Sequence, residues 1–232
     1  MEGGVLEVKW LIGRFVLCGS LLFPTTVLAV SEEAVELNKV GAKLFEQGKP
    51  EAAIIEFQKA IRLDTKYFPA RLNLAYAYEK MNRVEEAIDA YREAITTQPQ
   101  SFFAHNNLGV LYDKQGLYDS AIAEFEAALQ IETNNEMARK NLDTARKNKS
   151  TAQKREGEVL RAEKEAQARP NDPQASYNVA RLHAQYGNNN AALEWLTKAI
   201  KQGYKDLAYL RVDPAFRSLR EERAFEQLLV EK

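Results

Sequence analysis

Apolar residues recur at helical spacing through the middle of the chain. Between residues 72 and 95, one apolar stripe is followed by a second after a short polar break. Stripes with this period predict amphipathic helices. Polar breaks of the same kind lie at 47–50, 81–83 and 115–116, and two of the three contain glycine. The pattern therefore predicts pairs of helices that are joined by tight turns.

The paired stripes return every 34 residues. Each copy has small residues where two helices would cross closely and a large side chain that fills the space beside them. The three copies are Gly41, Leu44, Ala53, Phe57 and Ala60; Ala75, Tyr78, Ala87, Tyr91 and Ala94; and Leu108, Gly109, Tyr112, Ala121, Phe125 and Ala128.

These three copies in register resemble the tetratricopeptide-repeat (TPR) family and cover residues 34–135. The resemblance implies an all-α fold, a right-handed α-solenoid of helix–turn–helix units. It also implies a protein that holds other proteins or peptide segments, without catalysis and without a cofactor.

Residues 136–169 continue the pattern of a first helix, but no aromatic residue stands at the second-helix position. The segment carries 10 basic and 6 acidic residues, a net charge of +4, whereas residues 30–135 carry 11 basic and 17 acidic, a net charge of −6. Two interpretations are a solvated helix that bridges to the next unit and a basic patch for an acidic partner. Because charge runs are usually solvated faces, we expect a degenerate repeat and a charged helical bridge.

The repeat pattern returns over residues 170–204, with Tyr177, Ala180, Ala192, Leu196 and Ala199. Residues 205–232 resemble the closing segment of many bacterial TPR proteins. There, Asp213-Pro214 predicts a helix start, followed by an apolar face that includes Phe216 and Phe225. A stack of repeats ends in an open apolar flank, so we expect this segment to be a C-terminal helical cap.

The first 29 residues have the order of a secretory signal peptide. Lys9 and Arg14 precede the apolar run 15–23, and Val27-Leu28-Ala29 offers small residues for cleavage after Ala29. The alternative is an uncleaved anchor, for which the uncharged run 15–30 is short. We expect an exported protein, periplasmic or extracellular, that meets a membrane only if this segment stays attached.

Composition excludes several classes of function. The formal net charge of −1 gives no reason to expect a nucleic-acid partner. With one cysteine and two histidines, a structural zinc site is not expected. Phosphate-binding glycine loops and the HExxH and GxSxG motifs are missing, and His105 and His183 have no acidic residue at i±4. We expect no enzyme and no metal.

The resemblance also suggests where a partner would bind. In TPR proteins the sixth position of each unit projects from the first helix toward a concave groove, and here that position holds Asn73, Asn107, Asn141 and Asn178; the first unit has Lys39 instead. One interpretation is a ladder of carboxamides that grips the backbone of an extended peptide. The other is that each asparagine bonds to a neighbouring helix, and the sequence leaves both open.

Further groove candidates surround these asparagines: Tyr76, Lys80, Phe103, Asn106, Val110 and Lys114. TPR domains that bind chaperone tails hold the terminal carboxylate with lysine, arginine and asparagine residues. Only Asn73 matches that set, so a chaperone-tail receptor is not expected. The sequence therefore predicts an exported TPR adaptor that binds an extended partner segment in its groove. The alternative is an assembly subunit of a cell-envelope machine for pilus, secretion or polymer export, acting through other surfaces.

Overall fold

The computed structural model describes residues 31–230, all of whose regular elements are helical. The predicted signal peptide, residues 1–29, lies outside the described residues. The helices are α1 (Glu32–Glu46), α2 (Pro50–Leu63), α3 (Phe68–Lys80), α4 (Val84–Thr97), α5 (Phe102–Lys114), α6 (Tyr118–Ile131), α7 (Glu136–Ala168), α8 (Pro173–Gln185), α9 (Asn189–Lys201), α10 (Leu207–Val212), the 3₁₀ helix η1 (Pro214–Leu219) and α11 (Arg223–Val230).

The first six helices form three consecutive hairpins: α1 with α2, α3 with α4, and α5 with α6. The turns within the hairpins lie at the polar breaks of the sequence. Gly48 and Gly116 take φ values of 74° and 75°, and Asn82 takes 57°. Glycine reaches this left-handed region without the steric cost of a Cβ atom, and asparagine tolerates it better than most residues, so each first helix ends there.

Small residues set the distance between the two helices of a hairpin. Gly109 on α5 faces the ring of Phe125 on α6 so closely that an added Cβ would lie 2.7 Å from Cε1 of that ring. Gly41 and Phe57 make the same arrangement in the first hairpin, at 2.6 Å. The aromatic rings are buried, and with neighbouring alanines they form one core that runs through the first hairpins to Leu142 and Ala145 of α7.

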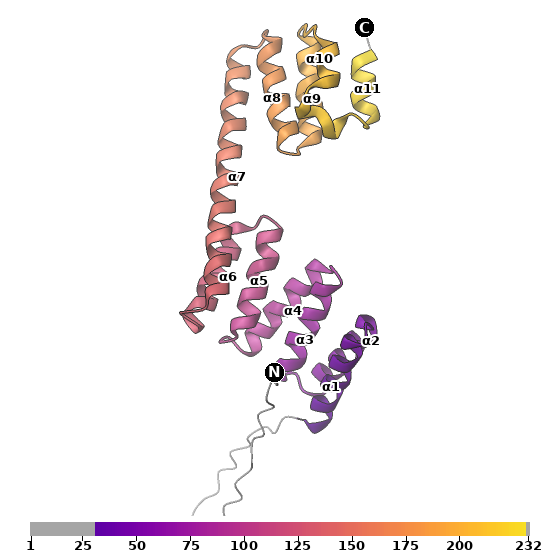
Figure 1. The fold of residues 1–232 in the computed structure, drawn as a ribbon, viewed down its shortest axis with the longest axis vertical. Helices are drawn as coiled ribbons and strands as arrows, with labels where there is room; N and C mark the ends of the chain where they lie inside the picture. Colours follow the sequence, from indigo (N-terminus) through magenta and orange to yellow (C-terminus); the bar gives the residue numbers. More distant parts are fainter. Residues whose placement is uncertain (1–30, 231–232) are drawn as a thin grey trace, which may run out of the picture.

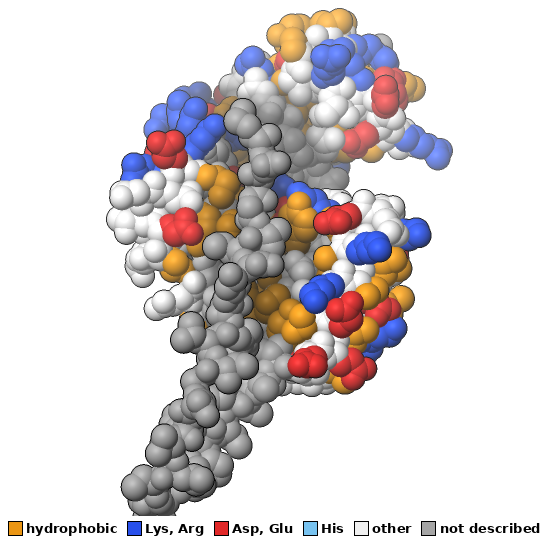
Figure 2. Space-filling view, turned by 60° about the horizontal axis from the view of Figure 1, so that its bottom comes forward, with side chains coloured by type: hydrophobic (Ala, Val, Ile, Leu, Met, Phe, Trp, Pro, Cys, Tyr) orange, Lys and Arg blue, Asp and Glu red, His pale blue; other side chains and the backbone are white. Residues whose placement is uncertain are grey.

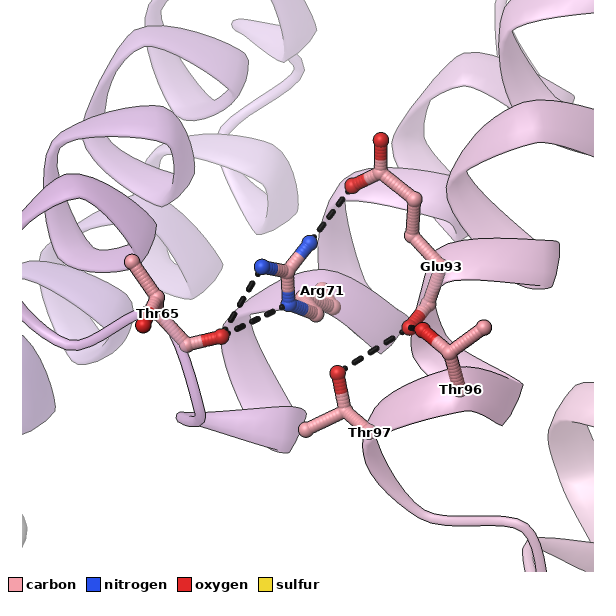
Figure 3. Close-up of polar contacts among 5 residues, drawn as sticks. All are labelled: Thr65, Arg71, Glu93, Thr96 and Thr97. Carbon is pink, nitrogen blue, oxygen red and sulfur yellow. Dashed lines mark hydrogen bonds and ion pairs between the residues drawn. The ribbon is translucent and has the colours of Figure 1, made fainter.

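Arg71 joins a loop between hairpins to the hairpin that follows it (Figure 3). Its Nε and Nη2 donate to the carbonyl oxygen of Thr65 at 3.2 and 2.8 Å, and its Nη1 lies 2.5 Å from Oε2 of Glu93 on α4. The hydroxyls of Thr96 and Thr97 donate to the backbone oxygen of Glu93, at 2.7 and 3.0 Å. The Arg71 side chain thus ties the loop after α2 to both helices of the next unit.

The same contact recurs in the next two units, at 34-residue intervals. His105 lies with Nε2 2.9 Å from the carbonyl oxygen of Pro99 and Nδ1 2.6 Å from Oε2 of Glu124 on α6. Arg139 donates to the carbonyl oxygen of Thr133 at 3.2 Å. The carboxylate beside His105 comes from the second helix of its unit, 19 residues along the chain, and not from position i±4 of α5.

The helix α7 is 33 residues long and divides the molecule into two parts (Figure 1). Its first half packs on α5 and α6, and its second half packs on α8. We call α1 to α6 with the first half of α7 the N-terminal lobe, and the second half of α7 with α8 to α11 the C-terminal lobe. In Figure 1 both lobes lie on the same side of α7, at opposite ends of it.

The segment after α9 packs against the hairpin of α8 and α9. Leu210, Phe216, Leu219 and Phe225 are buried in one cluster with Leu196 and the alanines of that hairpin. The helix start expected at Asp213-Pro214 is present and opens the 3₁₀ helix η1: the Asp213 side chain accepts a hydrogen bond from the Ala215 N–H at 3.0 Å. The segment therefore covers the apolar side of α8 and α9 with three short helices.

None of the helices within residues 31–230 combines the length and the hydropathy that a membrane crossing requires. At the lower right of the face shown in Figure 2, acidic and basic side chains are mixed with hydrophobic ones, so this part of the surface presents no field of a single sign.

Candidate partner-binding surface

The first helices of neighbouring units lie side by side, since α1 contacts α3 and α5 contacts α7. Two of the predicted groove residues on these helices are exposed aromatics: Tyr76 on α3 is 40% exposed and Phe103 on α5 is 60% exposed. Lys80 and Lys114 are exposed near the ends of the same helices, and Val110 is half-buried. We call these five residues the first-helix surface.

Each exposed aromatic ring is supported from below by a second ring. The centroid of Tyr76 lies 5.6 Å from that of Phe45 on α1, and Nζ of Lys80 lies 4.8 Å from the centroid of Tyr76. The ring of Phe103 meets buried Phe102 edge-on at 5.5 Å. These contacts hold the rings in place, and both rings still expose apolar surface that a partner could contact.

Two of the predicted asparagines join neighbouring first helices. Asn73 donates from Nδ2 to Oδ1 of Asn38 at 2.9 Å, and Asn141 donates from Nδ2 to Oδ1 of Asn106 at 3.0 Å. Both bonds join residues 35 apart, one repeat plus one position. Asn106 is only 3% exposed. Its expected place in the groove is therefore corrected, because its carboxamide lies beneath the surface and serves the packing of α5 against α7.

Asn107 on α5 belongs to a chain of hydrogen bonds with Tyr91 on α4 and Glu79 on α3. It donates from Nδ2 to the hydroxyl of Tyr91 at 3.0 Å, and that hydroxyl donates to Oε2 of Glu79 at 2.8 Å. Burial and the neighbouring Glu79 carboxylate raise the pKa of Tyr91, so the phenol stays protonated and can donate. Of the two interpretations left open by the sequence, bonding to a neighbouring helix thus describes Asn73, Asn107 and Asn141.

The fourth asparagine stands apart. Asn178 lies on α8 in the C-terminal lobe, is exposed, and accepts a hydrogen bond from Gln174 on the same helix at 3.1 Å. The other three belong to the N-terminal lobe. Because α7 separates the two lobes, the four carboxamides do not form one evenly spaced row.

Both histidines within residues 31–230 lie beside a glutamate of a neighbouring helix. His183 on α8 lies 3.2 Å from Oε1 of Glu163 on α7, which joins these two helices. Within residues 31–230, no group of three or more His, Cys, Asp and Glu side chains is placed to hold a metal ion. A pocket of about 410 Å³ between the α5–α6 turn and α7 is lined by Leu117, Asp119 and Lys149 among others, and by none of the predicted groove residues.

Comparison with known proteins agrees with this geometry. A family model described as "TPR repeat" matches residues 41–82, and one described as "Tetratricopeptide repeat" matches residues 72–136. The chain is a tetratricopeptide-repeat protein. A third model, of anaphase-promoting complex subunit 5, matches residues 160–212 of this TPR protein.

Among individual proteins, the chain is similar to a chloroplast protein of Arabidopsis thaliana, with 40% identity over 55 residues. That stretch is 24% of this chain and 16% of the relative, about one sixth of the relative's length. The solved structure of MamA from Desulfovibrio magneticus RS-1 is similar over 75% of this chain and 97% of its own, with a TM-score of 0.50 and 16% identity, which shows the fold alone.

A further similar structure is the first TPR domain of Spaghetti (RPAP3), solved with the HSP90 peptide SRMEEVD. It has 25% identity and a TM-score of 0.49, and the similarity covers 50% of this chain and 93% of the other.

Proposed function

We propose that this TPR protein is a non-enzymatic adaptor that binds an extended segment of a partner protein along its first-helix surface. The observation that carries the proposal is the pair of exposed, supported rings of Tyr76 and Phe103, on the first helices of successive units and flanked by Lys80 and Lys114. Exposed aromatics backed by a packed layer are the residues that most often anchor a protein interface.

The asparagines support the same surface from its base. The bonds that tie Asn73 and Asn141 to neighbouring helices use their amide nitrogens, and neither Oδ1 accepts a hydrogen bond from a residue between 31 and 230. Such an oxygen is suited to accept an N–H of a peptide backbone. The asparagines thus combine the two interpretations of the sequence: they hold the helices and leave an acceptor for a ligand.

We also propose that the protein acts outside the cytoplasm, in the periplasm or beyond the cell. The support is the order of charged, apolar and small residues over 9–29, which is typical of a secretory signal peptide. The mass of the protein recovered from its own cells distinguishes the forms: a chain that begins after Ala29 supports export with cleavage, whereas a full-length chain in the membrane fraction supports an anchor.

The binding surface is tested with exposed residues, because replacing Asn107 or Asn141 would also loosen the helices. Tyr76→Ser with Phe103→Ser removes both rings. Ile55→Ser, on α2, removes a comparably exposed apolar side chain outside the first-helix surface and is the matched control. Partners captured from source cells by the wild-type chain are identified by mass spectrometry, and their affinities for all three proteins are then measured by calorimetry.

We expect the double variant to lose at least about 30-fold in affinity, since an interface anchor contributes about 2 kcal/mol or more. The Ile55→Ser variant should bind as the wild type does. Equal binding by all three proteins would refute this surface and favour a protein that acts through other surfaces, such as a subunit of an envelope assembly.

A further inference from the structure

The helix α7 occupies the place of a whole repeat unit. The first helices α3, α5 and α7 begin at residues 68, 102 and 136, so their starts are 34 residues apart. A second helix would then begin near residue 152 and pack back on the first. Instead α7 runs without interruption from Glu136 to Ala168. Residues 136–169 are thus a unit in which the two helices of the hairpin are joined end to end.

The residue at the turn accounts for the missing break. The left-handed residues Gly48, Asn82 and Gly116 are spaced by 34, and Gly187 ends α8 in the same way. The corresponding position after Gly116 is Ser150, which lies in the middle of α7. A serine Cβ makes the left-handed conformation costly, so the helix continues through this position.

Two further substitutions oppose a closed hairpin. The close-contact position that holds Gly41, Ala75 and Gly109 in other units is Asp143 here. The facing alanine of the second helix, Ala121 in the third unit, is replaced by Arg155. Both are exposed in α7, whereas their counterparts in the closed units are buried. Closing this unit would bury both charges at positions that elsewhere admit only a glycine or an alanine.

Polar side chains of α7 instead contact the two lobes, the N-terminal lobe before Ser150 and the C-terminal lobe after it. Before Ser150, Asn148 donates to both carboxylate oxygens of Asp113 at 3.1 Å, and Arg146 lies 2.8 Å from Glu126. After it, the guanidinium of Arg155 lies 5.4 Å from the ring centroid of Tyr186. Each half of the helix is therefore anchored to its own lobe, and the exposed residues 150, 151, 153 and 154 lie between the anchors.

We propose that residues 136–169 are a repeat unit that is locked open by Ser150, Asp143 and Arg155, and that this open unit is a rigid spacer holding the two lobes apart. The spacer ends the row of first helices after Asn141 and starts a separate surface at Asn178. A partner then meets two surfaces at a set spacing instead of one continuous groove; this last consequence rests on the proposed function, whereas the open unit does not.

The test is a distance measurement between the lobes of the full chain. Spin labels are placed at two exposed positions by Ala123→Cys on α6 and Glu194→Cys on α9, with Cys18, the one native cysteine, replaced by serine. Pulsed electron resonance of this otherwise unchanged chain should give one narrow distance distribution. A broad distribution, or a short distance that corresponds to a closed hairpin, would overturn the proposal even if no further variant folds.

A closing variant tests the three residues directly. Asp143→Gly, Ser150→Gly and Arg155→Ala together restore the pattern of the other units, and the mean distance should shorten by about 25 Å, the length of the half-helix that folds back. The matched control combines Asp143→Gly and Arg155→Ala with Lys154→Gly in place of Ser150→Gly. It loses the same helix propensity but has no glycine at the turn position. An equal shift in both variants, or in neither, would contradict the role of position 150. Partner affinity is measured separately, so a wrong binding surface would leave this result unchanged.

Discussion

The close contact between Gly109 of α5 and Phe125 of α6 tests whether small residues set the distance between the helices of a hairpin. In Gly109→Ala, the new Cβ would lie 2.7 Å from Cε1 and 2.9 Å from Cδ1 of Phe125, a ring that is 1% exposed and has nowhere to move. Overpacking of this kind costs about 1 to 3 kcal/mol. The alanine also gains about 1 kcal/mol of helix propensity over glycine. The free energy of unfolding should therefore fall by up to about 2 kcal/mol.

Gly157→Ala is the matched control. Gly157 lies in α7, and apart from the backbone of α7 itself and the two adjacent residues, no atom lies within 4 Å of the Cβ that alanine would add. This variant gains the propensity without the clash, so it should be about 1 kcal/mol more stable than the wild type. Urea unfolding followed by far-ultraviolet circular dichroism measures both, with midpoints compared at an unchanged m-value. If Gly109→Ala were stabilised as much as Gly157→Ala, the close approach of α5 and α6 would not control the packing.

Two further outcomes follow from polar contacts, and a third follows from the residues that a carboxylate clamp would need. Tyr91→Phe removes the hydroxyl between Glu79 and Asn107 and should cost about 1 to 3 kcal/mol in urea unfolding, since both partners lose a bond; an unchanged midpoint would contradict the polar chain. Burial, together with the hydrogen bond to Asp213, raises the pKa of Tyr177 in the folded protein. Above about pH 10 the tyrosine therefore loses its proton in the unfolded chain before it does in the folded one, which favours unfolding. The free energy of unfolding should fall with rising pH in this range, more steeply than in Tyr177→Phe. A peptide ending in EEVD should bind no better than the same peptide with an amidated C-terminus, because the cations of a carboxylate clamp are missing; a clear preference for the free carboxylate in fluorescence anisotropy would reverse that inference.

Helix pairing followed directly from local residue types. The sequence predicts the turns at Gly48 and Gly116, because a positive φ at a tight turn favours glycine. It also predicts the packing of Phe125, because a large ring between two close helices needs a small residue opposite it. The contact between His105 and its acidic partner could not be predicted from local residue types. Its acidic partner, Glu124, belongs to the opposite helix of the hairpin, so only the packed pair brings the two side chains to 2.6 Å.

The periodic pattern by itself determined that this chain is a stack of helix pairs, since the pattern states which residues of each helix must be buried against the next. Only the tertiary structure decided what the asparagines do. Their positions are periodic, but a carboxamide bonds with whatever lies within about 3 Å, and that depends on how one unit packs against its neighbour. The tertiary structure likewise placed Asn178 in a different lobe from Asn73 and Asn107. The reason is that α7 continues through Ser150, at the position where the other units have a residue with positive φ.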